Sequence, residues 1–317
     1  MEMDELRIAI IGAGSMAREH ARAFARLPGV KVAGIASRTR ARAEALAAEM
    51  HIPLVADSPA ELHERTRAQL AVVTVPELAA NAVAKAVFPL PWAVLMEKPA
   101  GYDLADAEDI ARAAAGRRAP VMVALNRRFY SSSRAVLADL DTRPDEARFI
   151  HVQDQQSYAE ARRYNHPEKV VERFMYANSI HMIDLIPLFA RGDVRKVTRI
   201  TPWLGERTEV MLAHVQFSSG DSALYEGLWR GPGPWACSVA TAGRRWTMRP
   251  LEQAAYQNAN ERKRNEVEIA EDDRLAKPGF LAQARAAVAR ARGEPSPIPD
   301  LAEGLRTMRL IHDIFGV

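Results

Sequence analysis

Residues 6–17 read LRIAIIGAGSMA, an apolar run that breaks at two glycines and continues into an alanine-rich stretch. The pattern predicts a strand, a tight turn and a helix over residues 16–27, whose unpaired N–H groups face the turn and suit a pyrophosphate. Gly12 would allow the turn, and Gly14 would let the phosphates approach the backbone. A second apolar run, VKVAGIAS, lies at residues 30–37 and would close a βαβ unit. The sequence therefore predicts a dinucleotide-binding site.

Length and composition narrow the class of protein. The chain has 317 residues, of which 48% are hydrophobic, and this length favours two domains. Its 43 Lys and Arg residues are spread along the chain and nearly balance 40 Asp and Glu, so a nucleic-acid partner is not expected. Cys237 is the only cysteine, which excludes an internal disulfide, and the eight histidines lack metal-ligand spacing. We expect a cytoplasmic protein with no metal and no membrane segment.

Two kinds of hydrophobic pattern divide the chain. Up to about residue 120, short apolar runs alternate with helical patterns, which is typical of a doubly wound parallel sheet. The strands are predicted at residues 6–11, 30–36, 53–55, 70–75, 92–96 and 120–125. Later, period-two runs separated by SSGD and TAGR turns predict an antiparallel meander, followed by helices at 278–292 and 300–315. We predict an α/β Rossmann domain over residues 1–122 and an α+β domain over residues 123–317, whose last helix can pack back on the first domain.

The end of the second predicted strand bears on the choice of cofactor. An NAD-specific site usually offers Asp or Glu here, whereas this chain has Ser37 and Arg38. A hydroxyl and a guanidinium suit the 2′-phosphate of NADP. We therefore expect NADP in preference to NAD, although an Arg38 that stacks on adenine in an NAD enzyme would leave the same pattern.

Glu97-Lys98-Pro99 ends the fifth predicted strand, where doubly wound sheets bind their ligands. The other motifs are GAGSMA, VTVP at 73–76, VALNRRF at 123–129, NSIHMIDL at 178–185 and KPGF at 277–280. With these motifs, nearly the whole chain resembles the glucose-fructose oxidoreductase, inositol dehydrogenase and rhizopine-catabolism (Gfo/Idh/MocA) family. The resemblance implies hydride transfer between NAD(P) and a secondary alcohol or ketone of a sugar, nucleotide sugar or cyclitol. It also implies a homodimer or homotetramer assembled through the C-terminal sheet.

The resemblance gives Lys98 a catalytic role, because it places this amine near the reacting carbon and the nicotinamide. There Lys98 would move the hydroxyl proton as hydride is transferred. Partial burial and the positive oxidised ring would favour the neutral amine that a base requires. A surface lysine paired with Glu97 is the alternative interpretation.

His181 is the second catalytic candidate. It lies near the start of a helix predicted over residues 178–190, with Asn178 or Ser179 as the cap. Family members commonly carry an aspartate four residues before this histidine, and both groups reach the substrate hydroxyl. This chain has Ala177 at that position, so the usual carboxylate is missing.

Three explanations for the missing carboxylate stay open. His181 would work with Lys98 alone, Tyr176 or another group would supply the second contact, or the chemistry has been changed or lost. Asp184 would either orient the imidazole or lie on the helix surface as an ordinary acid.

The remaining predictions concern contacts to cofactor and substrate. Cofactor contacts are expected from Gly12, Gly14, Ser15, Met16, Ser37, Arg38, Thr74, Pro76, Glu97 and Lys98. Substrate contacts are expected from Asn126, Arg127, Arg128, Tyr164, Tyr176, Asn178 and His181. Paired arginine donors would bind a carboxylate or phosphate, and Arg162, Arg163 and Lys277 would extend that surface unless they form ordinary surface ion pairs.

Three other functions fit the same residues. An imine reductase on this scaffold would dispense with a carboxylate at position 177. A redox-assisted glycosidase or lyase would retain its cofactor without net consumption. A cofactor-binding sensor would bind NADPH tightly and show no turnover.

Overall fold

Two structural units share the chain in the computed structural model, which describes residues 5–317. The first unit consists of Met1–Asn126 and Leu275–Leu305, and the second consists of Arg127–Arg274 and Arg306–Val317. The sequence-based boundary assigns everything after residue 122 to the second domain. The structure instead groups Leu275–Leu305 with the first unit.

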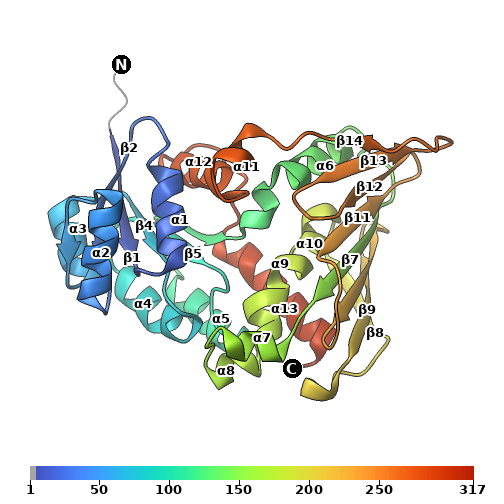
Figure 1. Cartoon of the computed structure of the whole chain (residues 1–317), viewed down its shortest axis with the longest axis horizontal. Helices are drawn as coiled ribbons and strands as arrows, with labels where there is room; N and C mark the ends of the chain where they lie inside the picture. The colour runs from blue at the N-terminus through green and yellow to red at the C-terminus, as the bar shows by residue number, and fades with distance from the viewer. Residues whose placement is uncertain (1–4) are drawn as a thin grey trace. The chain divides into compact units, whose positions relative to one another are not determined.

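The first unit is built on a six-stranded parallel sheet with the strand order β3-β2-β1-β4-β5-β6 (Figure 1). Its strands are β1 (Leu6–Ile11), β2 (Val30–Ala36), β3 (Val55–Ala56), β4 (Leu70–Val73), β5 (Ala93–Glu97) and β6 (Val121–Ala124). Every residue of β4 and β6 is buried, as expected for strands covered on both faces. The strand order reverses between β1 and β4, and open α/β sheets bind ligands beyond the carboxyl ends at such a switch point.

Helices cover both faces of this sheet. They are α1 (Ser15–Phe24), α2 (Arg40–Met50), α3 (Pro59–Thr66), α4 (Ala80–Val87), α5 (Leu104–Ala113) and α12 (Phe280–Ala291), with a 3₁₀ turn η1 at Glu77–Ala79. The helices α3 and α5 begin at side-chain caps, where Ser58 and Asp103 accept hydrogen bonds from backbone N–H groups of the first turn.

The late segment joins the first unit because α12 packs against α1. The Phe280 ring lies 4.9 Å from the ring of His20, a buried residue of α1. The apolar face of α1 also includes Ala17, Ala21 and Phe24, which are fully buried. Residues far apart in the sequence thus share one hydrophobic contact.

The second unit contains an eight-stranded sheet with the order β14-β13-β12-β11-β7-β10-β9-β8. Its strands are β7 (Phe149–Gln155), β8 (Val194–Arg199), β9 (Val210–Phe217), β10 (Ser222–Leu228), β11 (Ala236–Ala240), β12 (Arg244–Met248), β13 (Ala254–Asn258) and β14 (Asn265–Glu266). All neighbouring pairs are antiparallel except β7 and β10, which are parallel.

The prediction of one continuous meander was wrong at its centre. The SSGD turn joins β9 to β10 and the TAGR turn joins β11 to β12, as predicted. However, β7 lies between β10 and β11 and pairs with both. Local turn chemistry reveals hairpins, but it carries no signal for a strand that enters from an earlier part of the chain.

The helical segments of the second unit are short, and several lie along one face of its sheet (Figure 1). They are α6 (Ser131–Asp141), α7 (Tyr158–Arg163), α8 (Glu168–Val171), η3 (Met175–Ser179), α9 (Ile180–Ile183), α10 (Leu185–Phe189), η4 (Gly205–Arg207) and α11 (Glu271–Leu275). The turn η2 (Asn126–Phe129) and the helix α13 (Leu301–Phe315) contribute residues to both units. Within residues 5–317, no helix has the length and hydropathy needed to cross a bilayer.

Candidate active site

The backbone conformation and packing at position 12 require a glycine. Its φ of +112° lies in the region that favours glycine, and its N–H donates to the Ala36 carbonyl at 2.8 Å. A Cβ at this position would lie 2.3 Å from the Thr74 carbonyl oxygen. The Thr74 hydroxyl donates to the Ile11 carbonyl at 3.1 Å. Thr74, predicted as a cofactor contact, thus uses its side chain to hold the end of β4 against β1.

Gly14 differs, because nothing in the chain requires a glycine there. Its backbone is extended, with φ −91° and ψ −172°, and a Cβ would meet no atom within 4 Å. The residue is exposed at the N-terminus of α1, which has no side-chain cap and no acidic residue in its first turn. Open space beside uncapped N–H groups fits a pyrophosphate, so the residues present suit a dinucleotide.

Other predicted cofactor contacts surround this turn. Ser15 and Met16 occupy the first two positions of α1, and Pro76 is exposed just after β4. Ser37 follows β2, and its hydroxyl accepts a long hydrogen bond of 3.4 Å from the Thr39 N–H.

The two arginines after β2 have different surroundings. Arg38 is exposed, and within residues 5–317 its guanidinium has no hydrogen-bond or ion-pair partner. Arg40 instead pairs with Glu44 at 2.8 Å and with Asp57. The guanidinium of Arg38 therefore remains available to a ligand, whereas that of Arg40 does not.

Glu97 links the end of β5 to α1. Its Oε1 lies 2.7 Å from Nε2 of His20, which is 1% exposed, and its Oε2 accepts the Lys98 backbone N–H at 3.2 Å. Glu97 is predicted as a cofactor contact, whereas in the structure its carboxylate has partners inside the first unit. Lys98 is partly exposed, and the Lys98–Pro99 peptide bond is cis.

Lys277 lies next to the start of α1, whereas the sequence had suggested a place beside the substrate. Its Nζ is 3.7 Å from Sδ of Met16 and 5.3 Å from the centre of the Phe280 ring. The same loop is held by Asn126, whose amide donates to the Pro278 carbonyl at 3.2 Å. The available signal was the KPGF motif, but the packing of α12 on α1 could not be inferred from it.

Arg128 and Asp184 form a buried ion pair in the second unit. The carboxylate of Asp184 accepts from Nε and Nη2 of Arg128, each at 2.7 Å, and from the Thr307 hydroxyl at 2.8 Å. Asp184 is only 2% exposed, so it is not the helix-surface acid of the alternative interpretation. The pair joins η2 to the helical segment that carries His181.

The start of the His181 helix was predicted incorrectly. A π-helical turn, η3, precedes α9, and Ser179 is itself helical with no side-chain cap. Asn178 is no cap either, because its amide donates to Oε1 of Gln156 at 2.8 Å. The helical hydrogen bonding extends back to Met175, since no breaker residue stops it.

The two tyrosines predicted at the substrate site lie in contrasting places. Tyr176 is 1% exposed, and its hydroxyl donates to the Val317 carbonyl at 2.8 Å. Tyr164 is 68% exposed beyond α7, with the Arg163 guanidinium 5.6 Å from its ring centre. Arg162 forms exposed ion pairs with Glu168 and Glu206, which is the ordinary surface role.

Among residues 5–317, no three His, Cys, Asp or Glu side chains form a group that could hold a metal ion. Cys237 is buried, and this burial raises the pKa of its thiol, which disfavours the reactive thiolate.

The glycine turn and its surroundings agree with the comparison to known families. Residues 6–125 match the model of an oxidoreductase family with an NAD-binding Rossmann fold. The match covers the first part of the chain, so residues 6–125 are similar to the Gfo/Idh/MocA family. The predicted Rossmann fold, oxidoreductase class and nicotinamide cofactor are confirmed, and the choice between NAD and NADP stays a prediction.

Solved structures extend the similarity in fold to the whole chain. A dehydrogenase from Chromobacterium violaceum aligns with a TM-score of 0.83 and 18% identity, covering 99% of this chain and 95% of that one. UDP-N-acetylglucosamine 3-dehydrogenase GnnA from Acidithiobacillus ferrooxidans gives 0.77 and 18%, covering 98% and 97%. Levoglucosan dehydrogenase, solved with NADH and levoglucosan, gives 0.81 and 13%, covering 98% and 95%. No curated protein matches the sequence.

Proposed function

We propose that this chain is a member of the Gfo/Idh/MocA family and transfers hydride between NAD(P) and a secondary alcohol or ketone of a sugar, nucleotide sugar or cyclitol. The observation that carries the proposal is the open N-terminus of α1 at Gly14, with Lys98 at the carboxyl end of a strand in the same sheet. The substrate class draws on similar structures, among them a UDP-N-acetylglucosamine 3-dehydrogenase and a levoglucosan dehydrogenase.

Each catalytic candidate has a separate task in this proposal. When bound, the nicotinamide supplies the acceptor or donor of hydride. In the oxidation direction, the Lys98 amine accepts the proton of the substrate hydroxyl, and in reduction it returns that proton to the alkoxide oxygen. His181 orients the hydroxyl by a hydrogen bond. The first turn of α1 holds the pyrophosphate through its backbone N–H groups.

We expect the cofactor to be NADP rather than NAD. The Arg38 guanidinium is exposed beyond β2 and has no partner within the described residues, so its donors are available to a 2′-phosphate. Lys277, beside Met16 at the start of α1, adds a second positive charge near the phosphate-binding turn.

The test combines a substrate panel with one variant. Wild-type protein is incubated with NADP or NAD and a panel of sugars, nucleotide sugars, cyclitols and ketones, and reduced nicotinamide is followed by its absorbance. Lys98→Ala should lower kcat by at least about a hundredfold, the usual range for a general acid–base, and leave the Kd for NADPH unchanged. Lys85→Ala, which removes an exposed lysine paired with Asp109, is the matched control. Full turnover in Lys98→Ala would exclude Lys98 as the proton-transferring group.

A second candidate function is supported by Ala177, which stands where family members commonly carry a carboxylate. An imine reductase would not need that group, so ketimines belong in the same panel. Exclusive reduction of C=N substrates would favour this reading. Tight NADPH binding without turnover on any substrate would instead favour a cofactor-binding sensor.

Assembly into homodimers or homotetramers is proposed through the open face of the eight-stranded sheet. In the second unit, the helices α9 and α10 lie on the other face (Figure 1). The strands also expose large apolar residues, with Phe149 45%, Val194 40% and Val210 37% exposed. Light scattering coupled to gel filtration measures the assembly, and Phe149→Lys together with Val210→Lys should shift it toward the monomer.

A further inference from the structure

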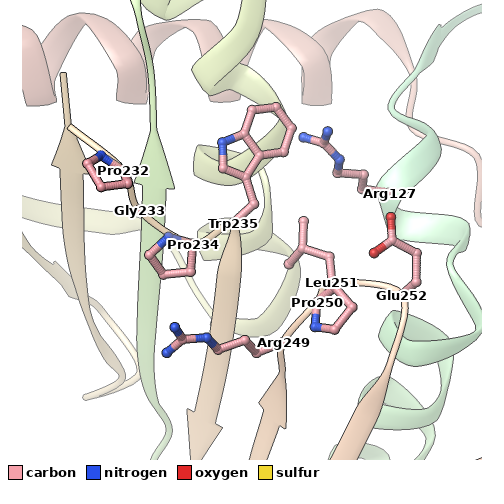
Figure 2. Close-up of a pocket in the computed structure, with 9 residues that line it drawn as sticks. All are labelled: Arg127, Pro232, Gly233, Pro234, Trp235, Arg249, Pro250, Leu251 and Glu252. Carbon is pink, nitrogen blue, oxygen red and sulfur yellow. The ribbon is translucent and has the colours of Figure 1, made fainter. Parts of the chain in front are cut away.

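A pocket of about 600 Å³ lies within the second unit, outside the nucleotide-binding turn (Figure 2). It is lined by Arg127, Pro232, Gly233, Pro234, Trp235, Arg249, Pro250, Leu251 and Glu252. These residues come from η2, from the loop between β10 and β11, and from the loop between β12 and β13. The volume falls within the usual range of small-molecule sites, about 300–1,000 Å³.

The walls of this pocket are held by hydrogen bonds to neighbouring elements. Nε1 of Trp235 donates to the Gln155 carbonyl at 2.7 Å, which fixes the indole against the end of β7. The Ser132 hydroxyl donates to the Leu251 carbonyl at 2.5 Å, which ties the second loop to α6. These hydrogen bonds hold the two loops in place, and a rigid pocket wall lowers the entropic cost of binding.

Arg127 is the unusual group in the pocket. Its guanidinium carbon lies 4.1 Å from the centre of the Trp235 ring, a cation–π arrangement that Figure 2 also shows. Its Nε and Nη1 are buried and have no hydrogen-bond partner among the described residues. Buried donors without acceptors are costly, and an anion in the pocket would supply the acceptor that the Arg127 donors lack.

The charges around Arg127 leave it without a close counter-ion. Glu252 is the acidic residue of the lining, and within residues 5–317 it forms no ion pair. Burial lowers the pKa of the Arg127 guanidinium, an effect opposed by Tyr130, whose hydroxyl is hydrogen-bonded to the guanidinium, and by the carboxylates of Asp154 and Glu252. Arg249 contributes a further positive charge, although Figure 2 shows its guanidinium directed away from that of Arg127.

We propose that this pocket binds an oxyanion, a phosphate or a carboxylate carried by a sugar-sized ligand, with Arg127 as the recognising group and Trp235 as its support. A planar guanidinium with free donors matches the geometry of both anions. The apolar side chains of Pro232, Pro234 and Leu251 also line the pocket, where they can contact the uncharged part of the ligand. That this ligand is the substrate rests on the proposed function. If it is, the substrate is an anionic sugar derivative.

Calorimetry on the full-length protein tests binding directly. The probes are a hexose 6-phosphate, a hexuronate and the parent neutral hexose, each titrated in the presence of NADPH. We expect at least one anionic probe to bind at least about tenfold more tightly than the neutral hexose, the gain typical of a charge-assisted hydrogen bond. The phosphate and carboxylate arms show which oxyanion the pocket prefers. Equal affinity for all three probes would overturn the proposal.

Three variants assign the binding to Arg127. Arg127→Gln should raise the Kd of the anionic probe at least about tenfold, because it removes the charged donors. Glu252→Gln should lower that Kd, because it removes a carboxylate that repels the anion. Arg245→Gln is the matched control, since Arg245 is exposed on β12 outside the pocket.

The opposite result for Glu252→Gln, a weaker binding of anions, would overturn the proposal even if Arg127→Gln failed to fold. Failure of the proposed function looks different. If anions bind through Arg127 but cause no change in nicotinamide absorbance, the anion pocket is supported and the dehydrogenase function is excluded. If wild type and Arg127→Gln oxidised anionic sugars equally well, the dehydrogenase would stand and the anion pocket would be excluded.

Discussion

Gly12 and Gly14 lie in one turn, and only Gly12 is required by the conformation and packing of the chain. A Cβ at Gly12 would overlap the Thr74 carbonyl, whereas a Cβ at Gly14 would meet open space. We therefore expect Gly12→Ala to lower the free energy of unfolding by at least about 2 kcal/mol, from backbone strain and overlap. Gly14→Val should leave stability within about 0.5 kcal/mol, as for a surface change, and raise the Kd for NADPH at least about tenfold.

Urea unfolding and fluorescence titration with NADPH measure the two quantities separately. Each glycine variant is the control for the other. Equal loss of stability in both variants would mean that the fold itself requires a glycine at position 14. Unchanged NADPH binding in Gly14→Val would show that the pyrophosphate does not bind at this turn.

The two arginines after β2 give a second matched pair. Arg38→Gln should lower kcat/KM for NADP by about tenfold to a hundredfold and leave the value for NAD nearly unchanged, because a charge-assisted hydrogen bond to phosphate is lost. Arg40→Gln should change neither value, because that guanidinium is already paired with Glu44 and Asp57. An equal loss with both cofactors in Arg38→Gln would favour stacking on adenine over recognition of a 2′-phosphate.

The position of a single residue could be predicted from the sequence where it depends only on neighbouring residues. The glycine turn, the end of β2 and Lys98 are all defined by the strand that precedes them, and the structure places each at such a strand end. The partners of Glu97 and Arg128 could not be predicted, because His20 and Asp184 lie far away in the sequence. The residues quoted as site candidates thus include some whose polar atoms are already engaged within the fold.

At the scale of elements, the pair of Glu97 and His20 connects β5 to α1. Removing the carboxylate leaves the buried imidazole and the Lys98 N–H without their acceptor. Glu97→Ala should therefore lower the free energy of unfolding by about 1–3 kcal/mol and also lower kcat, because Lys98 loses an anchor of its backbone.

Glu49→Ala is the matched control for this change, because it removes a carboxylate whose ion pair with Arg18 on α1 is exposed and contributes only about 0–1 kcal/mol. Urea unfolding and steady-state kinetics of both variants give the comparison. Equal effects in the two variants would show that the contact between Glu97 and His20 is no stronger than a surface ion pair.

The helices and strands that could be predicted are those defined by neighbouring residues in the sequence. The strands and helices of the first unit follow from alternating patterns and from caps such as Ser58 and Asp103. The insertion of β7 between β10 and β11 depends on pairing between distant strands, which no turn motif encodes. The π-turn before His181 was missed because its residues are ordinary helix residues.

At the scale of the molecule, the chain returns to its first unit late, through Leu275–Leu305. Composition and periodicity predict two domains, but they do not predict this return. It depends on the fit of α12 against α1, where Phe280 lies on His20. A single domain boundary along the sequence therefore cannot describe the first unit, which consists of two separate segments.

This organisation predicts which fragment folds. Residues 1–126 alone should aggregate or unfold at a lower temperature, because the face of α1 that α12 covers becomes exposed. Residues 1–126 joined to residues 275–305 should fold cooperatively and bind NADPH. The hydrogen bond of 3.2 Å between Asn126 and Pro278 brings the two cut ends near each other, so a linker of about eight Gly and Ser residues, which spans about 15 Å, suffices. Thermal melting and NADPH titration compare the two fragments, and equal stability and affinity in both would show that α12 is dispensable to the nucleotide-binding unit.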